Sequence, residues 1–160
     1  MSYLRKFWTS LQITFLKLDR ISRKVSRGER ISRFILSDKF MPKGRVSAAA
    51  FLPSPKTKDT SVYRTRNCNE RRIWLLGDVF VARIRKLDVL ARADLKSDLV
   101  FDNGLSIVAH PSPHPRHAVV TKWPDEKSLQ RIKALAWIIH EGEPFFSSPG
   151  VYAWVHGSKR

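Results

Sequence analysis

Strand-like and helix-like apolar patterns follow one another in this chain without the regular alternation of an α/β protein. Apolar residues recur at three- and four-residue spacing over 67–84 and 125–140, which predicts two helices. Short β-branched and aromatic runs predict strands. These runs are 34–36, 46–52, 61–65, 87–93, 105–109 and 117–121. We therefore expect an α+β fold, a mainly antiparallel sheet with two packed helices on one face.

Local signals add detail to this outline. Asn67, with a Glu three positions later, fits a helix N-cap. Gly77 in the middle of the first helix costs about 1 kcal/mol relative to Ala, so its presence indicates close packing by another element. The runs at 46–52 and 61–65 flank a proline-containing basic turn, which predicts a hairpin between them. Asn103-Gly104 is a strong turn signal.

Positive charge is concentrated toward the N-terminus. The first 58 residues hold 14 Lys and Arg against three acids, whereas the remaining residues hold 16 against 11. An apolar stripe over residues 3–18 predicts a helix, and an Arg/Ser-rich stretch over 19–33 is typical of a solvated linker. We divide the chain into a basic N-terminal helical arm at 1–29 and a globular domain at 30–160.

A charge excess of this kind repels itself in a compact protein and favours an anionic partner. The phosphate backbone of a nucleic acid fits best, because Lys and Arg bind phosphates by releasing condensed counterions. The sequence predicts a basic, nucleic-acid-associated accessory protein, with RNA and DNA both left open. The residues expected to bind are Arg20, Arg23, Lys24, Arg27, Arg30, Arg33, Lys43 and Arg45.

A proline-fixed loop carries His110, His114 and His117. Its prolines exclude a helix or a central strand, and no carboxylate lies nearby in sequence to complete a metal site. We expect no metal there, and the simplest interpretation of the loop is structural. The alternative is a small metal-independent nuclease or phosphodiester-processing enzyme. In that enzyme His117 would transfer protons, and Arg116 and Arg64 would stabilise negative charge.

Several functional classes are disfavoured by what the sequence lacks. It has no Walker loop, no Gly-x-Gly-x-x-Gly, no Gly-x-Ser-x-Gly and no His-Glu-x-x-His. Its single cysteine, Cys68, allows no internal disulfide and is expected to be structural. No apolar run approaches the ~18 residues of a membrane span, and no small-residue cleavage site follows the first helix. We expect a cytoplasmic protein without a cofactor.

An aromatic segment follows the last predicted helix. Leaving its large side chains in water would cost roughly 1.5–3 kcal/mol each. We therefore expect residues 145–155 to form an edge strand that completes the sheet or pairs with a second subunit. A protein partner or a homo-oligomer, and with it a role as a structural subunit of a complex, is the third functional hypothesis.

Five short motifs support a resemblance. They are Ile31-Ser32-Arg33-Phe34, Ala50-Phe51-Leu52-Pro53, Ser61-Val62-Tyr63-Arg64-Thr65, Ala91-Arg92-Ala93-Asp94 and Pro115-Arg116-His117-Ala118. Between Arg30 and Ala136 the chain resembles an uncharacterised family of short bacterial open reading frames. No activity is attached to that family, so the resemblance implies none.

Overall fold

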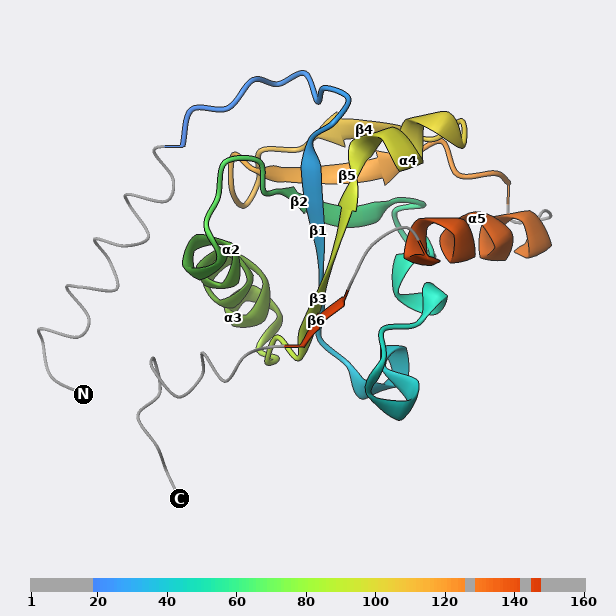
Figure 1. Cartoon of the computed structure of the whole chain (residues 1–160), viewed down its shortest axis with the longest axis horizontal. Helices are drawn as coiled ribbons and strands as arrows, with labels where there is room; N and C mark the ends of the chain where they lie inside the picture. Colours follow the sequence, from blue (N-terminus) through green and yellow to red (C-terminus); the bar gives the residue numbers. More distant parts are fainter. Residues whose placement is uncertain (1–18, 126–128, 142–144, 148–160) are drawn as a thin grey trace, which may run out of the picture.

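An antiparallel sheet runs through the molecule in the strand order β4-β5-β2-β1-β3-β6 (Figure 1). The computed structural model describes residues 19–125, 129–141 and 145–147, so the helix predicted at 3–18 lies outside the described residues. The strands are β1 (Arg30–Ile35), β2 (Thr60–Arg64), β3 (Ala91–Lys96), β4 (Ser106–Ala109), β5 (His117–Thr121) and the short β6 (Phe145–Ser147). The predicted α+β class and antiparallel sheet are confirmed.

One long helical rod and several shorter helices connect the strands. The rod is continuous from α2 (Glu70–Gly77) through a π-helical turn, η4 (Asp78–Ala82), to α3 (Arg83–Arg85). The other helices are η1 (Asp38–Phe40), η2 (Pro42–Gly44), η3 (Ala48–Phe51), α4 (Ser97–Asp102) and α5 (Leu129–Glu141). None of the helices in these described ranges is long and apolar enough to cross a membrane.

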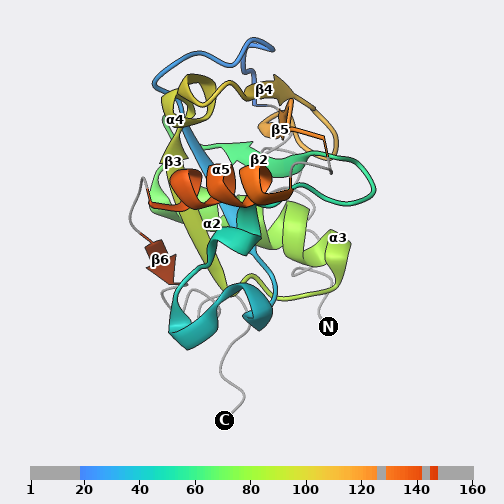
Figure 2. The same ribbon diagram turned by 90° about the vertical axis from the view of Figure 1, so that its right-hand side faces the viewer.

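The helices cover both faces of the sheet, which corrects the prediction that they share one face. In Figure 1, α2 and α3 lie to the left of β1 and β3, and α5 lies to their right. Figure 2 shows α5 in front of the strands. The reason is the alternation in β1, where Ile31 and Ile35 point to one face and Phe34 points to the other. An antiparallel sheet often leaves one face in water, but here both faces are apolar.

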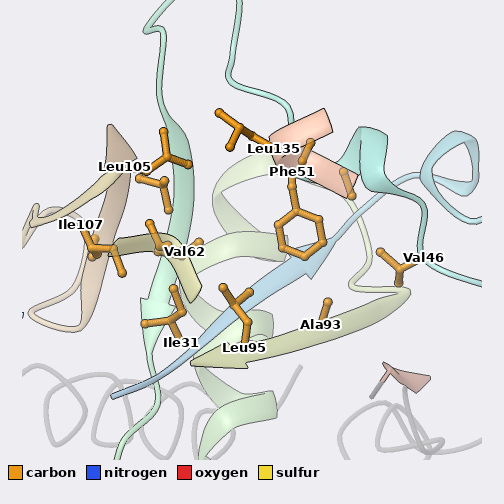
Figure 3. Packing of buried hydrophobic residues seen from close by; sticks show 14 of the residues in the cluster. Ile31, Val46, Phe51, Val62, Ala93, Leu95, Leu105, Ile107 and Leu135 are labelled. Carbon is orange, nitrogen blue, oxygen red and sulfur yellow. The ribbon is translucent and has the colours of Figure 1, made fainter. Parts of the chain in front are cut away.

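Two hydrophobic clusters fill the space on either side of the sheet. The α5 cluster includes Ile31, Phe51, Val62, Leu95 and Leu135, and draws on η3, α4 and α5 as well as the strands (Figure 3). The α2 cluster packs the helical rod on the opposite face. Its members are Phe34, Tyr63, Cys68, Ile73, Trp74, Leu76, Phe80, Ala82 and Val89.

The central strand begins inside the stretch that the sequence indicates is a solvated linker. Ile31 and Ser32 are both fully buried in β1. Ser32 is tolerated there because its hydroxyl donates to Asp94 Oδ1 at 2.6 Å and contacts the Thr65 hydroxyl at 3.0 Å. Polar residues in this strand therefore face partners inside the protein and not solvent.

The hairpin predicted from 46–52 and 61–65 does not form. Residues 48–51 make the 3₁₀ helix η3, and β2 pairs with β1 and β5. Three consecutive alanines carry no β-branched side chain to favour a strand. In the helix, Ala50 and Phe51 still reach the α5 cluster.

Other local predictions hold with small shifts. The helix cap is Asn69, whose side chain accepts the Arg72 amide proton at 2.9 Å, whereas Asn67 has a left-handed backbone. Gly104 takes the positive φ that the predicted turn needs.

The predicted C-terminal edge strand is confirmed over Phe145–Ser147, which pair with β3. Residues 148–155 lie outside the described residues.

Gly77 gives a direct test of the packing between the rod and the sheet. A Cβ added there would lie 2.8 Å from two atoms of the Phe34 ring. We expect Gly77→Ala to destabilise the protein by about 1–3 kcal/mol, because overpacking outweighs the gain in helix propensity. Chemical denaturation would measure the change.

The control is the double variant Gly77→Ala with Phe34→Leu. Removing the ring should relieve the clash, so the two substitutions should couple favourably in a double-mutant cycle. Additive losses would show that the ring does not set the requirement for glycine.

Candidate nucleic-acid interface and histidine site

A buried ion pair fixes the end of the arm to the sheet. The Arg64 guanidinium donates from Nε and Nη2 to the two carboxylate oxygens of Glu29, both at 2.8 Å, and both side chains are 2% exposed. The other donors of Arg64 bind the backbone carbonyls of Ser22 and Lys24. Arg64 therefore holds residues 22–29 against the sheet along their backbone.

A second pair lies beside the first. Arg116 binds the Asp19 carboxylate with Nε and Nη2, and its Nη1 donates to the carbonyls of Arg64 and Arg66. Burial alone would raise the pKa of Asp19, but the hydrogen bond and charge of Arg116, with Arg72 at 2.8 Å, hold that pKa below its usual value. The Glu29–Arg64 and Asp19–Arg116 pairs together form what we call the arm clamp.

The arm clamp contains Arg64 and Arg116, two of the residues that the sequence assigned to catalysis. Arg64 is 1% exposed and Arg116 is 7% exposed, and their guanidinium groups point into the protein. The structure brings them together with each other but directs them to the arm and away from His117. The clamp also packs residues 19–29, which the sequence assigns to the arm, onto the domain.

A shallow groove runs beside the clamped segment. It has a volume of about 530 Å³ and lies between residues 23–25 and the edge strand β4, with Arg23, Lys24 and Lys122 on its walls. A second hollow of about 460 Å³ shares Lys24 with the first and continues to Arg27. Val25 and Phe101 line both hollows. We call the two hollows the basic groove, and no Asp or Glu lines either of them.

The predicted nucleic-acid-binding residues fall into two groups. Arg20, Arg23, Lys24, Arg27, Lys43 and Arg45 are exposed, although Arg27 is paired with Asp98 and Asp102. Arg30 and Arg33 are half-buried and donate to backbone carbonyls. Lys122, which completes the groove, was missed because it lies outside the basic N-terminal stretch and reaches Arg23 and Lys24 only through the fold.

Exposed charge is strongly unbalanced across the described ranges, where 18 exposed Lys and Arg face five exposed Asp and Glu. Arginines inside the protein bind several of the acids, one of which, Glu70, remains exposed. Arg92, which is fully buried, forms bidentate contacts with Glu70 at 2.8 and 2.9 Å and with Asp94 at 2.9 and 3.0 Å. This network was not predicted, and its one visible signal in the sequence is the Arg-x-Asp alternation in β3.

His117 lies in a hydrogen-bonded chain on the face of the sheet that carries the α2 cluster. Its Nδ1 lies 2.8 Å from the His110 carbonyl oxygen, which only accepts, so the ring proton of the neutral imidazole sits on Nδ1. Nε2 then accepts from the Ser61 hydroxyl at 2.8 Å. Burial lowers the pKa of His117, although the nearby carboxylate of Asp59 acts in the opposite direction.

The other loop histidines have different surroundings. His114 is fully buried, packs against Phe80 with the two rings tilted and their centroids 4.5 Å apart, and accepts the Arg116 amide proton. His110 is exposed and meets the edge of the His117 ring. In the part of the chain that the structure describes, no three His, Cys, Asp or Glu side chains converge to hold a metal ion.

Cys68 belongs to the α2 cluster and is 7% exposed. Burial raises the pKa of its thiol, which disfavours the thiolate that a nucleophile needs. This environment supports the structural role expected from the sequence.

Comparison with protein-family models, with curated proteins and with solved structures returns no match to this chain.

The arm clamp predicts a large cost for losing one buried carboxylate. Glu29→Gln leaves the Arg64 charge buried without its partner, and we expect a loss of about 3–5 kcal/mol in the free energy of unfolding. Asp102→Asn, at the exposed pair with Arg27, is the matched control and should leave stability unchanged. Equal behaviour of the two variants in urea denaturation would show that the clamp does not hold the fold.

The environment of His117 predicts a pH effect on stability. Because its pKa in the folded protein lies below the usual 6.5, the unfolded chain takes up the proton first as pH falls. Stability should therefore decrease between about pH 7.5 and pH 5.5, and the decrease should be smaller in His117→Gln. The control is His110→Gln at the exposed ring, which removes only a secondary charge effect on His117 and should therefore change the slope of the urea midpoint against pH less than His117→Gln does.

Proposed function

We propose that this protein binds nucleic acid through its basic groove. The observation that carries the proposal is the lining of the groove, in which Arg23, Lys24 and Lys122 gather with no acidic side chain among them. Uncompensated cations that gather on one shallow surface create a positive potential, which attracts a polyanion. Phosphates that enter the groove would replace the counterions that Lys and Arg otherwise hold near them.

The arm clamp supports this proposal by fixing the backbone that carries two of these cations. Arg64 binds the carbonyl of Lys24 directly, and Glu29 accepts the Ser26 amide proton at 2.8 Å. A binding segment that is already held in place loses less conformational entropy when the ligand arrives. The exposed side chains of Arg23 and Lys24 are then free to reach phosphate oxygens.

Other exposed basic residues lie outside the groove. Arg20 lies in the arm, while Lys43 and Arg45 lie in and after η2. Contacts of this kind are to the phosphate backbone, so they supply affinity and not sequence preference. The proposal is therefore an accessory protein that binds nucleic acid without reading its sequence.

A nuclease built on Arg116 and Arg64 has weaker support. Both guanidinium groups already bind carboxylates and carbonyls inside the protein. A group that stabilises a reacting phosphate must reach the phosphate oxygens, and these two side chains are directed elsewhere.

The proposal predicts that charge reversal in the groove weakens binding more than the same reversal elsewhere. Arg23→Glu with Lys24→Glu should reduce affinity for a fluorescent oligonucleotide at low salt by about 100-fold or more, and should lower the slope of log K against log salt by about 2. Arg71→Glu with Arg83→Glu, on the exposed side of the helical rod, makes the same change in net charge as a control. Fluorescence anisotropy over a salt series would measure both.

Two results would contradict the proposal. Equal losses in the two double variants would mean that net charge alone governs binding. An affinity of the wild-type protein that stays constant from low to high salt would mean that phosphates are not the ligand.

A further inference from the structure

The lining of the basic groove is apolar as well as basic. Val25 and Phe101 line both hollows, and Ile107 lines the larger one. A nucleic-acid duplex presents its phosphates to a surface of this kind and keeps the faces of its bases stacked inside the helix, so it would leave the apolar groups without a partner. A single strand carries phosphates and also exposes the apolar faces of its bases. It therefore matches both parts of the lining.

Arg27 and Phe101 place two planar groups together in the smaller hollow. The Arg27 guanidinium lies over the Phe101 ring, 5.7 Å from the ring centroid. Its Nη1 also donates to Asp102 at 2.6 Å and to Asp98 at 3.4 Å, which holds the guanidinium in place although the Arg27 side chain is 61% exposed. Unpaired bases stack both on aromatic rings and on guanidinium planes. We call these two side chains the stacking pair.

The charge of Arg27 differs in its balance from that of the other groove cations. Its two carboxylate partners neutralise it, so it suits an uncharged planar group better than a phosphate. Among the ion pairs formed by the described residues, none involves Arg23, Lys24 or Lys122. These three cations keep their charge for phosphates. The groove thus places uncompensated cations beside a stacking surface, and a strand of alternating phosphates and bases needs both.

The β4 wall of the groove is an open edge of the sheet (Figure 1). Within the described residues β4 pairs only with β5. The His110 amide donates to the His117 carbonyl, and hydrogen bonds alternate along an antiparallel ladder, so the backbone groups of Ile107 and Ala109 point away from β5. Both residues line the larger hollow. Their N–H and C=O groups suit the donors and acceptors on the edge of an unpaired base, which a duplex uses for base pairing.

We propose that the basic groove binds single-stranded nucleic acid, with phosphates at Arg23, Lys24 and Lys122 and a base on the stacking pair. This inference rests on the proposed function and deepens it by naming the form of the nucleic acid. Two joined hollows hold everything that such a strand requires: uncompensated cations, planar side chains and an open strand edge. An acidic peptide would match the cations and the edge, but its carboxylates bring no apolar face to the stacking pair.

The first experiment needs only the wild-type protein and three labelled DNA probes. They are a single strand, the corresponding duplex, and a strand of the same length in which abasic sites replace the bases. We expect the ordinary single strand to bind about 10-fold or more tightly than either control in fluorescence anisotropy, because stacked bases add affinity that phosphates alone do not supply. A control probe that binds as tightly as the single strand would overturn the inference.

The second experiment removes the aromatic ring from the stacking pair. Phe101→Leu keeps an apolar side chain against the α5 cluster and should lower affinity for the single strand by about 5-fold or more, without changing affinity for the abasic strand. Phe40→Leu is the matched control, since Phe40 is also half-buried against the α5 cluster and has the Lys39 ammonium 4.8 Å from its ring centroid, but lines neither hollow. Equal effects of the two substitutions on the single strand would contradict the role of the stacking pair. The comparison of probes on the wild-type protein decides the inference even if Phe101→Leu does not fold.

Failure of this inference and failure of the proposed function give different results. If Arg23→Glu with Lys24→Glu weakens binding but the three probes bind alike, the groove binds phosphates only, and the inference alone is wrong. If that double variant binds every probe as the wild-type protein does, both proposals are wrong. An oligoglutamate peptide should displace the single strand poorly. Displacement equal to that by an unlabelled single strand of the same charge would show that the groove recognises charge alone, and would overturn the inference.

Discussion

The buried pair between Glu29 and Arg64 connects the arm, the sheet and the candidate binding surface. Glu29 precedes the central strand β1, and Arg64 ends its neighbour β2, so the pair joins two strand ends that lie far apart in sequence. The donors of Arg64 that remain bind the arm along its backbone. Breaking this one contact would free the segment that lines the basic groove and leave a charge in the interior.

Buried arginines also affect the charge balance of the surface. Arg64, Arg92 and Arg116 take up Glu29, Glu70, Asp94 and Asp19, and the chain holds only 14 acids in total. Each carboxylate that neutralises an interior guanidinium is unavailable to neutralise a surface lysine. The excess of exposed cations therefore follows from the composition of the chain and also from where its few acids are placed.

The sequence predicted the elements with clear periodicity and missed those that depend on distant partners. The helical rod, β2, β5 and the packing requirement at Gly77 follow from local patterns. Arg30 to Arg33 resemble a polar linker until Asp94 and Thr65 are placed beside Ser32, which local reasoning does not supply. The same limit applies at the candidate site. His117 was predicted to transfer protons, but the contact of its ring with Ser61 depends on the pairing of β2 with β5, and Arg116 and Arg64 turn toward Asp19 and Glu29.

The position of β1 at the centre of the sheet has a consequence for the order in which the protein can assemble. A chain made from its N-terminus produces β1 before β3, yet β1 completes one of its sides only with β3, which ends at Lys96. Until that residue exists, a strand from the middle of the mature sheet has an open edge. Open edges recruit strands from other chains, and the cationic stretch just before β1 repels a second copy of itself. The charge of the arm therefore disfavours pairing between the open β1 edges of two unfinished chains.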